Sequence, residues 1–422
     1  MSRSINFGFI LLFAFFSNCL SDELSGKLVF AHVIFRHGDR TPVSPYPTDP
    51  WRDPKFWPTG FGQLTNIGKM QHFELGKWLR NRYHTLLNAS YSRDDLFVQS
   101  TDVDRTLMSA LSNLAGLYEP KGNDIWNNNI LWQPIPVHTV PEKDDNMLAG
   151  KKSCPAYEYA VNQLKNSPEF QKLNKKYSYM YDYLTKYTGK IVDTIEGVEQ
   201  IYNTFYIEQL YNKTLPEWTK KVFPGGDMKN IADLSFALPT YTRKLARLKI
   251  GLLVKDIFDR FKKKLQKNKV KQSVWVYSAH DTTIANVLNA FKLFEWHNPP
   301  YTACILIELR IDYNKRPLIS IFYKNSSKTP EPLLIPECGI QCPLSQMYNL
   351  YKEILPDDWE KECKLPNLWI MAYDSYATEY SSSTLFILLG LFITIGVFMS
   401  VFYFISIYLR RRQYVNYRCY VQ

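Results

Sequence analysis

One pattern occurs at three places along the sequence and restricts the fold more than any other feature: a short apolar run is followed at once by polar and charged residues. The runs cover residues 28–35, 96–98 and 274–277. Nearly continuous apolar runs of this kind are typical of strands that are buried on both faces of a parallel sheet. Helix-like stretches, 106–117 and 282–291, follow the second and third runs. We therefore expect an α/β fold with a mixed, mainly parallel central sheet flanked by helices.

The residues that follow the expected strands include histidines, arginines and aspartates, in the segments Arg36 to Pro42, Ser100 to Arg105 and Ser278 to Asp281. In open α/β sheets, ligands bind beyond the carboxyl ends of the strands, so these segments are placed to share one site. Burying their charges without a partner would be costly. Planar guanidinium groups donate paired hydrogen bonds to adjacent phosphate oxygens. The pattern therefore predicts a phosphate-binding site.

Both ends of the chain carry apolar segments that indicate its compartment. Residues 1–21 have the pattern of a secretory signal peptide, so we exclude them from the fold. Residues 384–409 contain no charged residue and are long enough for a transmembrane helix. Arginines at 410–412 follow, and the positive-inside rule then places the tail, 410–422, in the cytosol. The sequence predicts a single-pass type I membrane protein whose bulk, 22–380, is lumenal or extracellular.

Sequons and cysteines fit passage through the secretory route. Glycosylation is expected at the N-x-S/T sites Asn88, Asn212 and Asn325. Cys338 and Cys342 are close enough in sequence to bridge locally, Cys154 and Cys363 could tie distant segments together, and an oxidising lumen permits both bonds. Cys304 lies in an apolar run and is expected to be buried and free.

The three junction segments together resemble histidine acid phosphatases, most closely the lysosomal and prostatic branch of that family. The resemblance covers roughly Lys27 to Leu365 and extends to Gly60 through Thr65, to Asn212 through Trp218 and to the order of the cysteines. An Arg-His-Gly triplet alone would be weak evidence. The run Arg36 to Pro42 combined with a distant His-Asp pair, both after strands, is highly specific.

The resemblance implies a role for each matching residue. His37 would be the nucleophile that forms a phosphohistidine intermediate, and Asp281 would be the general acid and then the general base. The phosphoryl oxygens would be bound by Arg36, Arg40, Arg105 and His280. No metal and no cofactor would be needed. At about pH 5 we expect enough Asp281 to be protonated while the arginines keep His37 neutral.

Other residues allow simpler interpretations. His32 is expected to be a core histidine; Asp39 and Asp102 either orient the arginines or cap turns, and Asp104 or Asp102 could cap the helix that follows. The other histidines lack zinc-ligand spacing, so no metal site is predicted. The net charge is +11, but the basic run 260–271 contains a single aromatic residue, Phe261, and lacks the regular aromatic interleaving of a nucleic-acid surface. It therefore indicates a solvated face, not a nucleic-acid partner.

The segment 156–253 is expected to form a smaller, mostly helical lobe, which the family places over the site, inserted between core segments 27–155 and 254–365. In the tail, Tyr414 and Tyr417 are similar to tyrosine-based signals that bind a sorting adaptor, which would favour the lysosomal or endosomal membrane over the plasma membrane. A homodimer is a further implication of the family.

The sequence thus predicts an acid phosphatase that hydrolyses phosphate monoesters. The alternatives are a narrow-specificity phosphatase of lysophospholipids or inositol phosphates, and an inactive anion-binding receptor ectodomain. His280-Asp281 favours the acid phosphatase branch over relatives with His-Ala-Glu, and intact His37 and Asp281 argue against an inactive receptor.

Overall fold

The computed structural model describes residues 24–266, 270–365, 394 and 396–407. These residues belong to two units, 1–363 and 364–422, which are described separately. The predicted signal peptide and cytosolic tail lie outside the described residues, as does much of the predicted span; within the span, residues 396–407 are helical. No helix among the described residues is both long enough and apolar enough to cross a membrane.

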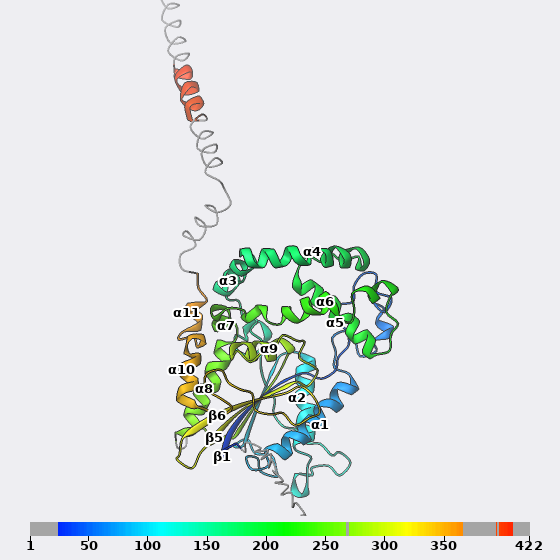
Figure 1. The fold of residues 1–422 in the computed structure, drawn as a ribbon, viewed down its shortest axis with the longest axis vertical. Coiled ribbons are helices and arrows are strands. Elements are labelled where there is room, and N and C mark those ends of the chain that lie inside the picture. Colours follow the sequence, from blue (N-terminus) through cyan, green and yellow to red (C-terminus); the bar gives the residue numbers. More distant parts are fainter. Residues whose placement is uncertain (1–23, 267–269, 366–393, 395, 408–422) are drawn as a thin grey trace, which may run out of the picture. The chain divides into compact units, whose positions relative to one another are not determined.

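A seven-stranded sheet forms the centre of the first unit, with the strand order β3-β2-β4-β1-β5-β6-β7 (Figure 1). Its strands are β1 (Lys27–Arg36), β2 (Leu96–Thr101), β3 (His138–Val140), β4 (Val274–Ala279), β5 (Cys304–Ile311), β6 (Pro317–Lys324) and β7 (Cys342–Pro343). The β3·β2, β2·β4 and β4·β1 pairs are parallel. The β1·β5, β5·β6 and β6·β7 pairs are antiparallel. The predicted mixed α/β fold is confirmed, but only the half of the sheet formed by β1 to β4 is parallel.

Helices cover both faces of this sheet (Figure 1). One face carries α1 (Asn66–Arg82) and α2 (Asp104–Leu117), whereas the other carries α8 (Gly251–Leu265), α9 (Asp281–Ala290) and α10 (Leu344–Tyr351). Successive side chains of a strand point to opposite faces. Accordingly, Val33 packs in the cluster of α1 and α2, and Ile34 packs in the cluster of α8 and α9. Coverage of both faces explains why β1 and β4 are almost continuously apolar.

Four helices form a group beside the sheet, to which we refer as the lobe: α3 (Pro155–Lys165), α4 (Pro168–Thr188), α5 (Ile195–Leu210) and α6 (Gly226–Ser235). These helices share an apolar cluster of their own, which includes Leu184, Phe205 and Met228. The alternating tyrosines in α4 show the helical period: Tyr177 and Tyr181 are buried, whereas Tyr179 between them is exposed. The next helix, α7 (Arg243–Lys249), contributes instead to the cluster of the sheet.

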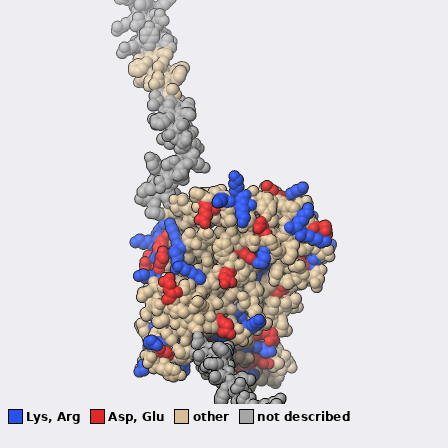
Figure 2. Space-filling model, viewed as in Figure 1, with Lys and Arg blue, Asp and Glu red and all other residues tan. Residues whose placement is uncertain are grey.

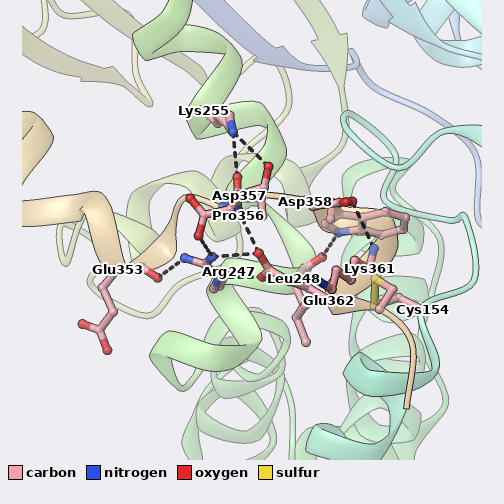
Figure 3. A network of polar contacts seen from close by, with 12 residues as sticks. Cys154, Arg247, Leu248, Lys255, Glu353, Pro356, Asp357, Asp358, Lys361 and Glu362 are labelled. Carbon is pink, nitrogen blue, oxygen red and sulfur yellow. Dashed lines mark hydrogen bonds and ion pairs between the residues drawn. A yellow bond between two sulfur atoms is a disulfide. The ribbon is translucent and has the colours of Figure 1, made fainter. Parts of the chain in front are cut away.

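The end of the first unit, which includes α11 (Trp359–Glu362), is fastened to α7 and α8 (Figure 3). The Arg247 Nε lies 2.6 Å from a carboxylate oxygen of Glu362, and the Trp359 indole donates to the Leu248 carbonyl over 2.8 Å. The predicted disulfides Cys154–Cys363 and Cys338–Cys342 are both present. Cys304 is buried and is the free cysteine among the described residues.

The basic run in α8 is partly engaged within the fold. Arg260 stacks on Trp275 and pairs with Asp256, and Lys264 donates to backbone carbonyls at 271 and 272. Lys262 and Lys263 are exposed. On the face shown in Figure 2, basic and acidic side chains are interspersed. This arrangement fits the predicted solvated surface.

Candidate active site

Arg36 ends β1 and lies at the centre of a polar cluster. Its Nη2 is 2.8 Å from the Asp281 carboxylate, and its side chain is only 2% exposed. Its Nη1 donates to Asn298 Oδ1 over 3.3 Å and to the Pro299 carbonyl. The Tyr301 ring centroid lies 4.4 Å from the guanidinium carbon, a cation–π contact. The guanidinium is therefore held on several sides before any ligand binds.

His37 follows directly and has one ring nitrogen available for chemistry. Its Nδ1 lies 2.8 Å from the Gly38 carbonyl, which can only accept a hydrogen bond. The proton is therefore on Nδ1, and Nε2 keeps its lone pair. The backbone is fixed as well: the His37 amide donates to Ala279 over 3.0 Å, and its carbonyl accepts from Thr302 over 3.2 Å.

The turn after His37 packs against α1 with no room for a side chain. A Cβ atom on Gly38 would lie 2.4 Å from the Gly68 carbonyl oxygen, and one on Gly68 would lie 2.3 Å from the Asp39 carbonyl oxygen. The Gly38 amide donates to Ser109 Oγ of α2 over 3.1 Å. Two facing glycines thus let the loop and the helix meet backbone to backbone, which restricts how far His37 can move.

Burial and positive charge keep His37 neutral. Burial lowers the pKa of His37 well below its usual value, and the guanidinium groups of Arg36 and Arg40 lower it further. This agrees with the expectation that the arginines maintain a neutral ring. The structure adds desolvation as the larger cause.

The loops after β2 and β4 bring His280 beside His37, with their ring centroids 5.8 Å apart. Arg105 Nη2 donates to His280 Nδ1 over 3.5 Å, so the proton of the neutral ring is on Nε2, which donates to Thr101 Oγ1 over 3.1 Å. Burial, followed by the charge of Arg105, lowers the pKa of His280 to about 3. Both histidines are therefore neutral in this arrangement.

Asp281 is the first residue of α9. Burial raises the pKa of Asp281, but the charges of Arg36 and Arg40 outweigh this effect, so the pKa ends below its usual value. The expectation that Asp281 is substantially protonated at about pH 5 is therefore wrong for the site without phosphate. Its ion pair with Arg36 is the physical reason.

Arg40 and Arg105 complete the cationic cluster. Arg40 Nη2 donates to Asn203 Oδ1 of α5 over 3.0 Å, and Nη1 donates to the Thr41 carbonyl over 3.1 Å. Within the described residues, the buried Nε groups of Arg36, Arg40 and Arg105 have no hydrogen-bond partner. Unpartnered buried donors on clustered guanidiniums are suited to an anion with several oxygens. The predicted residues are thus brought to one site.

Sequence reasoning missed two groups that support the site. One is the loop before β5, whose Asn298, Pro299 and Tyr301 hold Arg36. The other is Asn203 on the lobe, which holds Arg40. For Asp39 the structure shows a third arrangement: its carboxylate accepts from the hydroxyl groups of Thr65 and Tyr211, and among the described residues it pairs with no arginine.

The remaining polar residues are those at the start of α2 and the candidate metal ligands. The residue at the N-cap of α2 is Val103, without a side-chain cap, so the capping role expected for Asp104 or Asp102 is wrong. No group of three or more histidine, cysteine, aspartate or glutamate residues in the described part of the chain is placed to hold a metal ion.

Comparison with known proteins assigns the family. Residues 27–324 match the histidine phosphatase superfamily (branch 2). The chain belongs to this superfamily. It is 38% identical to human prostatic acid phosphatase over 373 residues, which cover 87% of this chain and 95% of the relative. It is also 38% identical to human lysosomal acid phosphatase over 368 residues, which cover 86% of each chain.

Two solved phytase structures share the fold. The apo form of Hafnia alvei phytase superimposes with a TM-score of 0.60 at 17% identity, covering 82% of this chain and all of that one. The phytase from Citrobacter braakii gives a TM-score of 0.59 at 19% identity, covering 81% of this chain. The predicted family is confirmed, and with it the prediction of a phosphatase.

Proposed function

We propose that this protein is an acid phosphatase that hydrolyses phosphate monoesters through a phosphohistidine on His37. One observation carries the proposal: the neutral ring of His37 keeps a free Nε2 lone pair beside buried, unpartnered guanidinium donors. A nucleophile next to a cluster that binds an oxyanion is the arrangement that phosphoryl transfer needs. Arg36, Arg40, Arg105 and His280 would hold the phosphoryl oxygens.

The proposed reaction has two displacements at phosphorus. His37 Nε2 forms a bond to phosphorus as the bond to the ester oxygen breaks, and Asp281 gives its proton to the departing alkoxide. Asp281, now ionised, takes a proton from water. The resulting hydroxide attacks phosphorus, the P–N bond breaks, and its electron pair returns to Nε2. Phosphate leaves, and both side chains are restored.

Substrate binding would allow Asp281 to take up from solvent the proton that the free site lacks. A bound dianion would engage Arg36 and compete with Asp281 for the 2.8 Å ion pair. Because cations hold the pKa of Asp281 down, their engagement by phosphate would raise it. The same dianion would raise the pKa of His280, so that its Nδ1 could carry a proton and donate to a phosphoryl oxygen. An acidic optimum would then belong to the enzyme–substrate complex.

The surrounding chain is proposed to follow the predicted secretory organisation. This comprises a signal peptide at 1–21, a lumenal domain at 22–380, a membrane span at 384–409 and a tail that binds a sorting adaptor. Within the domain, the core would comprise 27–155 and 254–365, and the lobe 156–253. Exposure supports glycosylation at Asn88, Asn212 and Asn325. Resemblance to lysosomal acid phosphatases supports the lysosomal membrane. A homodimer remains part of the proposal.

Phosphate release from p-nitrophenyl phosphate tests the activity. The purified full chain should hydrolyse this ester faster at about pH 5 than at about pH 7, in the presence of a chelator. His37→Ala should abolish the activity, whereas His84→Ala, at an exposed histidine in the turn after α1, should not. Acid quench of the wild type with a labelled ester should trap phosphohistidine. A folded wild-type protein without activity would overturn the proposal in favour of an anion-binding receptor.

A further inference from the structure

The lobe contributes a carboxyl group that the proposed mechanism leaves unused. Glu199 lies on α5, one helical turn before Asn203, and residues at this spacing share a helix face. Asn203 accepts a hydrogen bond from Arg40 over 3.0 Å, so this face of α5 is directed at the phosphate-binding loops. Glu199 is half-buried. Its carboxyl group makes no hydrogen bond or ion pair with any described residue, so it is free to contact a ligand.

The charged groups that face Glu199 belong to the site itself: Asp281 at the start of α9, Arg40 in the loop after β1, and Arg36 at the end of β1. Burial, followed by the negative charge of Asp281, raises the pKa of Glu199 to about 7, although both arginines act in the opposite direction. Glu199 is therefore neutral at acid pH and becomes negative close to neutral pH.

The position of Glu199 relative to the reaction follows from its neighbour Asp281. In an in-line displacement, the leaving oxygen lies opposite the attacking His37 Nε2. Asp281, as the proposed proton donor, lies next to that oxygen. Glu199 lies one turn before Asn203 on the α5 face that meets Arg40. Asp281 is among the charged groups around Glu199, so the carboxyl group of Glu199 is placed on the same side, toward the alcohol part of the ester. Glu199 thus faces the leaving group.

We propose that Glu199 is a specificity-determining residue that favours phosphate monoesters whose alcohol carries an ammonium group close to the ester oxygen. A carboxylate and an ammonium group form a charge-assisted hydrogen bond in this partly desolvated position. An uncharged alcohol gains nothing from the ionised carboxylate. The inference rests on the proposed phosphatase function and adds the chemical class of leaving group.

The expected signature is a preference that grows with pH. Below the pKa of Glu199 the carboxyl group is neutral, and an ammonium ester has little advantage over an uncharged one. Above it, one charge-assisted hydrogen bond is worth about tenfold in kcat/KM. A fixed, pH-independent preference would instead point to shape or to another group.

The test compares O-phosphoethanolamine with propyl phosphate, its close uncharged analogue, using the purified full chain from about pH 5 to about pH 8. The ratio of their kcat/KM values cancels the titration of His37 and Asp281, which both esters share. In the wild type this ratio should rise about tenfold with a midpoint near pH 7. In Glu199→Gln the ratio should not show this rise. Any pH dependence that remains in the variant comes from the phosphate ionisations of the two esters and is the baseline for the wild type.

Three controls separate the possible failures. Glu199→Asp keeps the charge and should restore the rise. Glu196→Gln removes a neighbouring α5 carboxylate that pairs with Lys165 over 3.0 Å, and it should keep the wild-type curve. Thermal unfolding confirms that each variant is folded. A Gln curve that rises as in the wild type would overturn the role of Glu199 alone. If the wild type hydrolysed neither ester, the proposed function and this inference would fail together.

Discussion

Two clusters of buried ionisable groups in this protein are held in opposite electrostatic states. At the strand ends, burial and then the arginines lower the pKa values of His37 and His280, and the arginines outweigh the effect of burial on Asp281. On α5, burial and a neighbouring carboxylate raise the pKa of Glu208 to about 9. Burial disfavours the charged form in both clusters. The dominant neighbouring charges act in the same direction at His37, His280 and Glu208, whereas at Asp281 they oppose burial and outweigh it.

This difference in charge state gives the two clusters different roles: the strand-end cluster serves ligand binding, and the α5 cluster affects the stability of the fold. The strand-end cluster keeps its positive charge and its unpartnered donors, which makes it ready to receive a dianion. The α5 cluster favours a bound proton instead. Neither carboxylate oxygen of Glu208 has a hydrogen-bond partner among the described residues, and burial followed by the charge of Asp49 raises the pKa of Glu208. Both side chains are buried. A proton held by Glu208 removes the repulsion between this carboxyl group and Asp49.

Removing the proposed proton donor of the strand-end cluster should give the largest effect. In Asp281→Asn, kcat for an alkyl phosphate should fall by about 10²- to 10⁴-fold, because an alkoxide leaves poorly without a proton. Hydrolysis of p-nitrophenyl phosphate should fall less, since p-nitrophenolate leaves without assistance. Steady-state rates with both esters measure the difference. Equal losses for the two esters would mean that Asp281 mainly positions Arg36, its ion-pair partner.

The α5 cluster, Glu208 with Asp49, should make the fold less stable as the pH rises. The pKa of Glu208 is raised in the folded state, so its stabilising contribution is fully present below the unfolded value of about 4.5 and is lost as the pH rises toward about 9. Glu208→Gln removes the titration but keeps the shape of the side chain. We expect the free energy of unfolding of the wild type to fall by about 1–3 kcal/mol more than that of the variant across this range.

Urea unfolding of the full chain at several pH values, followed by tryptophan fluorescence, measures how the free energy of unfolding changes with pH. Glu158→Gln, at an exposed position on α3, is the matched control and should keep the wild-type slope. Parallel curves for wild type and Glu208→Gln would show that the Asp49–Glu208 contact does not hold a proton at neutral pH.

The two clusters also differ in how far the sequence predicts them. Arg36, His37 and Arg40 lie in one run after an apolar strand, and His280 and Asp281 follow another, so residue pattern and position along the chain are enough to indicate a shared site. The α5 residues have no such signal. Asn203 meets Arg40 across 163 positions of sequence, and an amphipathic helix does not reveal which of its polar residues faces a ligand.

Two other features of the structure could not be predicted from the sequence for similar reasons. The loop before β5 supports Arg36 partly through the Pro299 carbonyl, which every residue type possesses and which no motif can signal. Apolar runs indicate buried strands but not strand direction, so the antiparallel β5 and β6 could not be distinguished from parallel strands. Tight turn chemistry between β5 and β6, at Asp312 to Arg316, is the local feature that indicates the antiparallel connection.

Removing a hydrogen-bond acceptor that holds Arg36, at a residue proposed not to contact the substrate, should have an intermediate effect on kcat/KM. In Asn298→Ala, Arg36 loses its 3.3 Å acceptor, and kcat/KM for p-nitrophenyl phosphate should fall about tenfold. Inhibition by inorganic phosphate should weaken in step, which a general loss of packing would not produce. Asn298→Asp, which keeps the acceptor oxygen, should recover most of the phosphate affinity. Unchanged inhibition in Asn298→Ala would mean that Pro299 and Tyr301 are sufficient to hold Arg36.

The smallest expected effect lies where the two regions meet. Asn203→Ala removes the 3.0 Å contact by which α5 holds Arg40, but Arg40 keeps its bond to the Thr41 carbonyl. KM should therefore rise only about threefold, less than the cost of one full hydrogen bond, with kcat nearly unchanged. Asn203→Asp should lower KM at about pH 7, because a carboxylate holds Arg40 more firmly than an amide oxygen does. A large fall in kcat in Asn203→Ala would show that the lobe helps to align the reacting atoms, and the separation between a binding cluster and a stabilising cluster would then no longer hold.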